Sequence, residues 1–221
     1  LLNGGSALEY FISADKIGSV WGTAVDEGDT STKIYTSAVL KRHVGLGPDG
    51  LGAIYVSDTS TGTSISSMTA DKFVDLVADF GIDVGQTQVA DNATRGLSDK
   101  ASDPSLDTDV FPLIGRVGLG DMDFDDAHEN LLVVNLHDNS IYKINLADGA
   151  SGIPQAYVIP DAGYSDAEMH PWAIEVTGGK LYAGVVYSPT ATSQDDFKAA
   201  VYQLDLGTGV WSGLPVIEFP L

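Results

Sequence analysis

Short runs in which apolar and polar residues alternate recur along the chain, and clusters of turn residues separate them. The clearest is IYKINL (141–146), whose period of two predicts a half-buried β-strand. Three segments share this kind of ending: AIYVSDTSTG (53–62), SIYKINLADG (140–149) and AVYQLDLGTG (200–209). Their common tyrosines, Tyr55, Tyr142 and Tyr202, mark an internal repeat.

Each repeat contains four strand-like runs rich in Val, Ile, Tyr, Phe and Leu. The first runs are VWGTAVDEG (20–28), LGDMDFDD (119–126) and PWAIEVTGG (171–179), and the second are KIYTSAVL (33–40), NLLVVNLHD (130–138) and KLYAGVVYS (180–188). The third runs are the endings above, and the fourth are FVDLVADFG (73–81), AYVIPDAG (156–163) and WSGLPVIEF (211–219). Residues 70–80 fit a helix equally well, because Phe73, Leu76, Val77 and Phe80 have i, i+3, i+4, i+7 spacing.

Four-stranded units that repeat in this way are typical of a β-propeller. We therefore expect residues 1–221 to be a single all-β propeller segment of about three four-stranded blades, at about 16–81, 115–163 and 170–221. The first two blades are separated by a polar insertion at about 82–114, which we expect to be a surface excursion. It carries Asp91, Asp99, Asp103, Asp107 and Asp109.

Three blades are too few for a closed ring, since propellers have typically four to eight blades. We expect the segment to belong to a ring of six or seven blades. The run GSALEYFIS (5–13) is a candidate for the outer strand of a last blade. The chain starts without Met or a leader-like segment, so we expect it to be a processed or excised piece of a longer protein.

Composition narrows the possible functions. The chain has 221 residues, 31 of them acidic and 11 basic, for a net charge of −20, and it has no cysteine. This charge repels phosphate backbones and argues against nucleic-acid binding. Disulfides and cysteine-bound metals are impossible. We expect no membrane span, because no apolar run approaches the ~20 residues that a bilayer requires. The acidic, Gly- and Ser-rich composition suits an exported bacterial protein, extracellular or at the cell surface.

The densest group of carboxylates is Asp121, Asp123, Asp125 and Asp126. Calcium prefers several oxygen ligands, and alternating Asp residues on a strand and turn would present two or three together, so these four are candidate Ca²⁺ ligands. The spacing is not that of an EF-hand loop. The competing interpretation is a polar strand face followed by the start of a turn.

Lys41, Arg42 and His43 form a candidate binding site for a carboxylate, a sulfated glycan or an acidic neighbour. The competing interpretation is that Arg42 pairs with local Asp residues and stabilises a long Gly-rich loop. Trp21 and Trp172 occupy equivalent repeat positions, which favours packing between blades over sugar stacking.

Catalytic and cofactor signatures are missing. The sequence has no G-x-S-x-G, H-E-x-x-H, phosphate-loop or dinucleotide-binding motif. His43, His128, His137 and His170 have no metal-ligand spacing. We therefore expect a protein that is not an enzyme, with Ca²⁺ as its candidate ion.

Three stretches resemble a known family: LKRHVGLGPDGLGAIYVSD (40–58), VGLGDMDFDDAHENLLVVNLHDNSIYKINL (117–146) and HPWAIEVTGGKLYAGVVYS (170–188). They resemble the β-propeller modules of large bacterial cell-surface or secreted proteins, which often also carry SdrD-like B repeats. They are more distantly similar to YVTN, NHL and SMP-30-like propeller repeats. The resemblance implies surface display, adhesion or scaffolding, and it supplies no catalytic residues.

The first hypothesis for function is a non-enzymatic structural or adhesive propeller module of an exported bacterial surface protein, possibly self-associating. Its partners would be the remainder of its own propeller, neighbouring copies, a glycan or a surface protein. One alternative is a Ca²⁺-dependent SMP-30-like hydrolase or lactonase, with Asp26, Asp121 or Glu175 as ligands in a central channel. The other is a carbohydrate-binding propeller.

Overall fold

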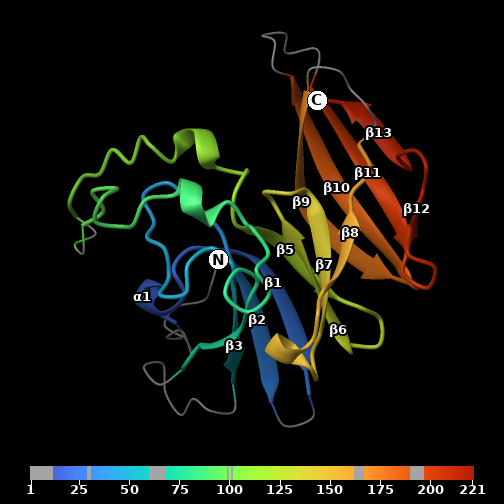
Figure 1. The fold of residues 1–221 in the computed structure, drawn as a ribbon, viewed down its shortest axis with the longest axis horizontal. Helices are drawn as coiled ribbons and strands as arrows, with labels where there is room; N and C mark the ends of the chain where they lie inside the picture. Colours follow the sequence, from blue (N-terminus) through green and yellow to red (C-terminus); the bar gives the residue numbers. More distant parts are fainter. Residues whose placement is uncertain are drawn as a thin grey trace, which may run out of the picture.

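The computed structural model describes residues 12–28, 31–59, 68–98, 100, 102–161, 167–189 and 197–221, and its strands form three antiparallel sheets (Figure 1). The first sheet contains β1 (Val20–Glu27), β2 (Thr32–Ala38), β3 (Ala53–Asp58) and β4 (Asp71–Asp75). The second contains β5 (Leu119–Phe124), β6 (Asn130–Asn135), β7 (Ser140–Asn145) and β8 (Gln155–Val158). The third contains β9 (Ala167–Thr177), β10 (Lys180–Pro189), β11 (Lys198–Asp205), β12 (Val210–Trp211) and β13 (Ile217–Pro220). The prediction of an all-β fold is confirmed.

The helices of the described residues are short: α1 (Ala14–Ile17) and the 3₁₀ turns η1 (Gln86–Gln88), η2 (Phe111–Leu113) and η3 (Gly149–Ser151). In this part of the chain, no helix has the length and apolar character needed to cross a bilayer. Almost all of the predicted strand at 5–13 lies outside the described residues.

The internal repeat has the same strand register in each sheet. In every sheet the pairing of the second strand with the third begins three residues before the partner of the repeated tyrosine, at Lys33, Asn130 and Lys180. Tyr55 lies opposite Thr36, Tyr142 opposite Val133 and Tyr202 opposite Ala183. These positions can therefore be compared one for one between sheets.

The sheets stand side by side, with β1, β5 and β9 adjacent to one another (Figure 1). The pairing of β1 and of β5 shifts register near the start of each strand, and that of β9 shifts between Pro171 and Ala173. The backbones approach most closely at Gly22 of β1, where an added Cβ would lie 2.7 Å from the carbonyl oxygen of Gly120 and 2.8 Å from the nitrogen of Met122. Glycine is required at position 22 because no side chain fits between the two strands.

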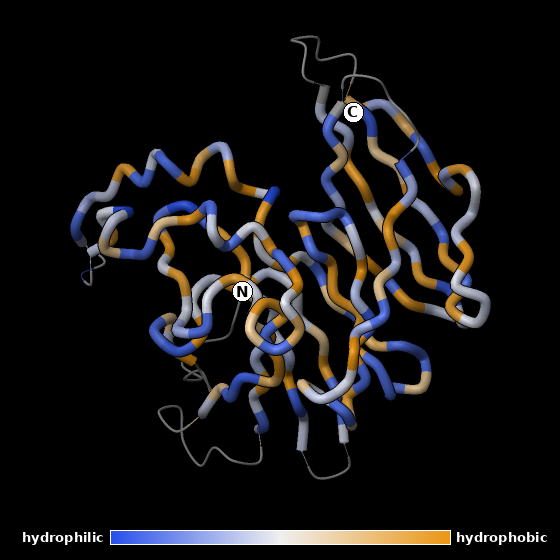
Figure 2. Tube along the Cα trace, viewed as in Figure 1, coloured by the Kyte–Doolittle hydropathy of each residue, from blue (hydrophilic) through white to orange (hydrophobic). Residues whose placement is uncertain are grey.

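Two hydrophobic cores fill the spaces between the sheets, as expected from strands that alternate hydrophobic and hydrophilic positions (Figure 2). Tyr35 and Ile54 of the first sheet pack with Leu131 and Val133 of the second. On the other face of the second sheet, Leu132 packs with residues of the third sheet. The second sheet therefore packs one face against the first sheet and the other face against the third.

The ambiguous segment at 70–80 is a strand followed by a turn. β4 ends at Asp75, whose Oδ1 accepts hydrogen bonds from the backbone N–H groups of Val77 (2.9 Å) and Ala78 (3.1 Å). The apolar side chains that fit a helix, such as Leu76, instead pack into the first core.

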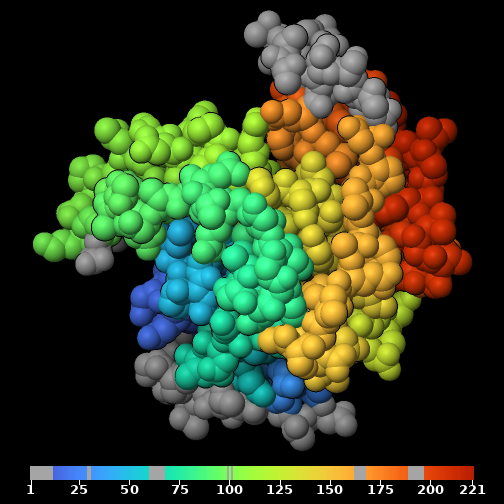
Figure 3. All heavy atoms as spheres, viewed as in Figure 1, coloured from blue at the N-terminus to red at the C-terminus, as the bar shows by residue number. Residues whose placement is uncertain are grey.

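The segment at 82–114 is not only a surface excursion. Val84 and Val110 are buried in the first core, and the side chains of Arg95 and Asp107 are also buried. In Figure 3 the chain between β4 and β5, in teal to green, lies beside the yellow to orange strands of the second sheet. The polar composition of this segment conceals the apolar residues that attach it to the core.

Gly22→Ala tests the close approach of β1 and β5. The added methyl group must push two backbones apart, and overpacking of this kind costs about 1–3 kcal/mol. We expect a lower free energy of unfolding in urea and a lower Tm. Gly213→Ala is the matched control, because an added Cβ there meets no atom within 4 Å. Equal stability of the two variants would contradict the proposed constraint.

Candidate functional site

The predicted acidic cluster lies where the second sheet meets the third. Asp121 and Asp123 lie on β5, and their carboxylates reach across to β9. The backbone N–H of Ile174 donates to Oδ2 of Asp121 at 3.2 Å, and that of Val176 donates to Oδ2 of Asp123 at 2.7 Å. Burial raises the pKa of Asp121 above its usual value, although the bond from Ile174 opposes this effect.

The other two members of the cluster also accept backbone hydrogen bonds. Asp126 accepts the N–H of Gly179 in the third sheet. Asp125 holds the turn between β5 and β6, where its Oδ1 accepts N–H groups from Glu129 (2.9 Å) and Asn130 (3.1 Å). Burial opposes ionisation of Asp125, but the hydrogen bonds from Asn130 outweigh it and hold its pKa below the usual range.

These carboxylates do not converge on one point. Among the described residues, no group of three or more His, Asp or Glu side chains is placed to hold a metal ion. The candidate ligands of the hydrolase alternative have separate surroundings. Asp26 lies 3.7 Å from His128, Asp121 accepts the N–H of Ile174, and Glu175 is exposed on β9. Calcium binding at Asp121, Asp123, Asp125 and Asp126 stays a prediction, and it would compete with the backbone hydrogen bonds.

Two members of the predicted basic site are occupied by contacts within the chain. Nζ of Lys41 donates to the carbonyl of Val20 at 2.7 Å and lies 5.6 Å from the ring centroid of Trp21. Arg42 donates through Nε (3.2 Å) and Nη2 (2.7 Å) to the carbonyl of Leu106. The loop-stabilising interpretation of Arg42 therefore holds, with a carbonyl oxygen in place of the expected Asp.

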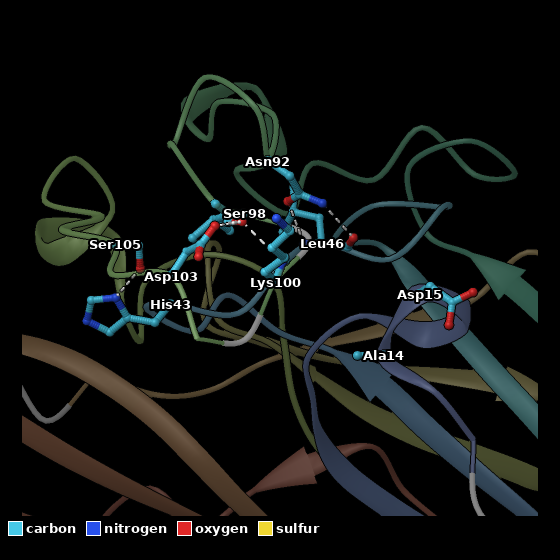
Figure 4. Close-up of a pocket in the computed structure, with 11 residues that line it drawn as sticks. Ala14, Asp15, His43, Leu46, Asn92, Ser98, Lys100, Asp103 and Ser105 are labelled. Atoms are coloured by element: carbon cyan, nitrogen blue, oxygen red, sulfur yellow. Dashed lines mark hydrogen bonds between the residues drawn. The ribbon is translucent and has the colours of Figure 1, made fainter.

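His43 borders a pocket of 670 Å³ between α1 and the 92–105 segment (Figure 4). His43 has a positive φ of 65°, and its Nδ1 lies 2.8 Å from Oγ of Ser105. Asn92 fixes the pocket's inner wall by bonding both the N–H (2.8 Å) and the carbonyl (3.1 Å) of Leu46. The polar lining, which includes Ser98, Lys100 and Asp103, suits a small hydrophilic ligand.

The two repeated tryptophans, Trp21 on β1 and Trp172 on β9, contact each other. The ring centroids of Trp21 and Trp172 are 5.1 Å apart at an interplanar angle of 59°. Trp21 contacts another sheet through Trp172, but it is 51% exposed, so the large buried area expected of it is not found. Trp172 lies against Gly115, where an added Cβ would be 2.7 Å from the indole.

A second hollow of 560 Å³ lies beside the start of β9. Arg116 and Glu168 form a two-bonded ion pair there, and Nε2 of His170 lies 2.8 Å from Oγ of Ser188. Burial lowers the pKa of His170, and the positive charge of Arg116 adds to this effect. Both effects favour the uncharged form of the imidazole.

Comparisons with known proteins give distant likenesses. No family model matches the chain. Colossin-D of Dictyostelium discoideum is 25% identical over 196 residues, which cover 84% of this chain and 18% of Colossin-D. The chain therefore spans less than a fifth of that relative's length.

Two solved structures are similar at low scores. The GH74 enzyme of Niastella koreensis has a TM-score of 0.34 and 15% identity, over 87% of this chain and 29% of the enzyme. A glycoside hydrolase has a TM-score of 0.31 and 11% identity, over 90% of this chain and 49% of its own. Scores this low carry no argument about activity.

Sequence reasoning missed the ion pair between Arg95 and Asp107, which anchors the insertion. Nε of Arg95 donates to Oδ1 of Asp107 at 3.0 Å, and Nη2 donates to Oδ2 at 2.7 Å. Nη2 also reaches the carbonyl of Val44 at 3.2 Å, and Oδ2 accepts the N–H of His43 at 2.7 Å. The signal available in the sequence was a single arginine within an acidic insertion.

Asp107→Asn should destabilise the protein by about 3–5 kcal/mol, because it leaves the buried Arg95 charge unpaired. Burial opposes ionisation of Asp107, but Arg95 outweighs it and holds the Asp107 pKa below its usual value. Stability from the pair is therefore complete above the unfolded pKa of about 4 and is lost as pH falls through the lower folded pKa.

Urea unfolding of wild type and Asp107→Asn between pH 2 and 7 checks both effects. Asp109→Asn is the control, since Asp109 is exposed in the same segment. A variant as stable as wild type at pH 7 would contradict the assigned role of the pair.

Proposed function

We propose that the three sheets are consecutive blades of a β-propeller and that the chain is a non-enzymatic structural or adhesive module of an exported bacterial surface protein. The equal register of the sheets and the side-by-side placement of β1, β5 and β9 support the blade assignment. A ring of six or seven such blades would be completed by further sheets. Extracellular or cell-surface location belongs to the same proposal.

The observation that carries this proposal is that the carboxylates of Asp121 and Asp123 are hydrogen-bonded to the backbone of the neighbouring sheet. In an enzyme of the hydrolase type, acidic side chains on the innermost strands would point at a substrate or a metal ion. Here Asp121 and Asp123 accept backbone N–H groups of β9 instead. Their hydrogen bonds connect neighbouring sheets, which is what a scaffold requires.

Asp123→Ala distinguishes the scaffold from the calcium-dependent hydrolase. Loss of a hydrogen bond to a charged acceptor costs about 1.5–3 kcal/mol, and we expect the lower part of that range because Asp123 is partly exposed. We expect a lower Tm, and no heat of Ca²⁺ binding by calorimetry in either wild type or variant. Tight Ca²⁺ binding by wild type that Asp123→Ala abolishes would contradict the scaffold assignment.

Carbohydrate binding is a second candidate, and the exposed Trp21, in contact with the partly buried Trp172, favours it. Indole rings supply flat apolar surfaces for sugar rings, and Lys41 adds a positive charge beside Trp21. Trp21→Ala should abolish any signal on a glycan array if this candidate is right. Trp211→Ala serves as the control, because Trp211 packs against the core between the second and third sheets. Glycan signals that survive Trp21→Ala would exclude the Trp21 site.

A further inference from the structure

Lys41 and Arg42 carry positive charges that no carboxylate of the described residues neutralises. Their hydrogen bonds go to the carbonyl oxygens of Val20 and Leu106. Most of the other lysines and arginines form ion pairs, among them Arg95, Arg116 and Lys180. Two adjacent cations without an acidic partner are unexpected in a chain with 31 acidic and 11 basic residues.

The acidic residues on the neighbouring segments are already engaged. Asp107 follows Leu106 in the chain, but both of its carboxylate oxygens accept hydrogen bonds from Arg95. Glu168, on the strand that carries Trp172, pairs with Arg116. The charges of Lys41 and Arg42 are therefore left for an anion from outside the chain.

Each of these cations lies over an aromatic ring that solvent reaches. Nζ of Lys41 is 5.6 Å from the ring centroid of Trp21, and Cζ of Arg42 is 5.8 Å from that of Phe111. Trp21 is 51% exposed and Phe111 is 70% exposed. Contacts at this distance attract a cation to the face of the ring. The surface therefore combines open aromatic rings with positive charges beside them.

These side chains form one patch, because a closed circuit of neighbours connects them. Trp21 contacts Trp172, and Trp172 lies against Gly115. Gly115 comes two residues after η2, which begins at Phe111. The circuit closes through Arg42, which lies over Phe111 and is next to Lys41 in the chain. We call Trp21, Lys41, Arg42, Phe111 and Trp172 the basic aromatic patch.

We propose that the basic aromatic patch binds a glycan that carries a single carboxylate, such as one that ends in a uronic acid. A sugar ring would stack on the exposed part of Trp21, and the carboxylate would accept N–H groups from Lys41 and Arg42. Both cations have donors left for it. Nζ of Lys41 makes one hydrogen bond with its three N–H groups, and Nη1 of Arg42 makes none to the described residues.

The net charge of −20 limits the ligand to a small anion. A polyanionic chain is repelled along its whole length, as a nucleic acid is. A single carboxylate interacts mainly with the two nearby cations, because exposed charges more than about 8 Å away are screened at physiological ionic strength. An acidic peptide offers the carboxylate without a sugar ring for Trp21.

This assignment deepens the carbohydrate-binding candidate and rests on it, because it names the class of sugar. Calorimetry with two disaccharides tests it: glucuronic acid linked to glucose, and glucose joined to glucose by the same linkage. We expect wild type to bind the acidic disaccharide about tenfold more tightly, since hydrogen bonds between charged groups are the stronger ones. Trp21→Ala should remove the binding of both.

Lys41→Gln should reduce the preference for the acidic disaccharide to less than about threefold and leave the affinity for the neutral one unchanged, because the charge-assisted hydrogen bond is lost. Lys72→Gln is the matched control, since it removes a lysine of β4, at the opposite edge of the first sheet from β1. Circular dichroism and urea unfolding check that each variant is folded.

Equal affinity of wild type for the two disaccharides would overturn the acidic-sugar assignment, as would an unchanged preference in Lys41→Gln. Either result would leave the carbohydrate candidate standing. Tighter binding of heparin, a polyanion, than of the acidic disaccharide would overturn the restriction to a single carboxylate. No signal on the glycan array, together with no heat from either disaccharide, would remove the carbohydrate candidate and the assignment together.

Discussion

The structure depends on how the first strand of a sheet satisfies the backbone groups along its open edge. One side of β9 pairs with β10, and the other side would leave N–H groups without partners. Asp121 and Asp123 supply the missing acceptors from the neighbouring sheet. Between the first two sheets, Ser37 of β2 accepts the N–H of Gly22 in its own sheet and donates to the carbonyl of Gly120 in the second sheet. The sheets are thereby joined by hydrogen bonds as well as by apolar packing.

The strands were predictable because their signal is local. A period of two is visible within six residues, and the repeated tyrosines gave the matching positions that Tyr55, Tyr142 and Tyr202 occupy in the sheets. The role of the acidic cluster was not predictable, since three of its four acceptors, Asp121, Asp123 and Asp126, have donors 53 residues later. The constant offset can be recognised only once β5 and β9 are known to be adjacent.

The prediction that the segment at 82–114 is only a surface excursion was wrong for a related reason. Composition correctly indicated a polar segment. However, five Asp residues near Arg95 in the sequence are possible ion-pair partners, and their spacing alone does not identify Asp107. Selection depends on the loop that carries Lys41 and Val44, whose carbonyls also receive Nη2 of Arg95. A buried ion pair of this kind is specified by three segments together, so no one of them contains the signal.

Glu175 occupies in the third sheet the position that Asp123 occupies in the second. Asp123 lies opposite Leu132, Glu175 lies opposite Tyr182, and these two pairs occupy the same register position in their sheets. Glu175 is therefore the third sheet's counterpart of the carboxylate that binds the following sheet, yet it is exposed. A further blade in the register of the proposed ring would bring a backbone N–H group to Glu175, as β9 brings the N–H of Val176 to Asp123.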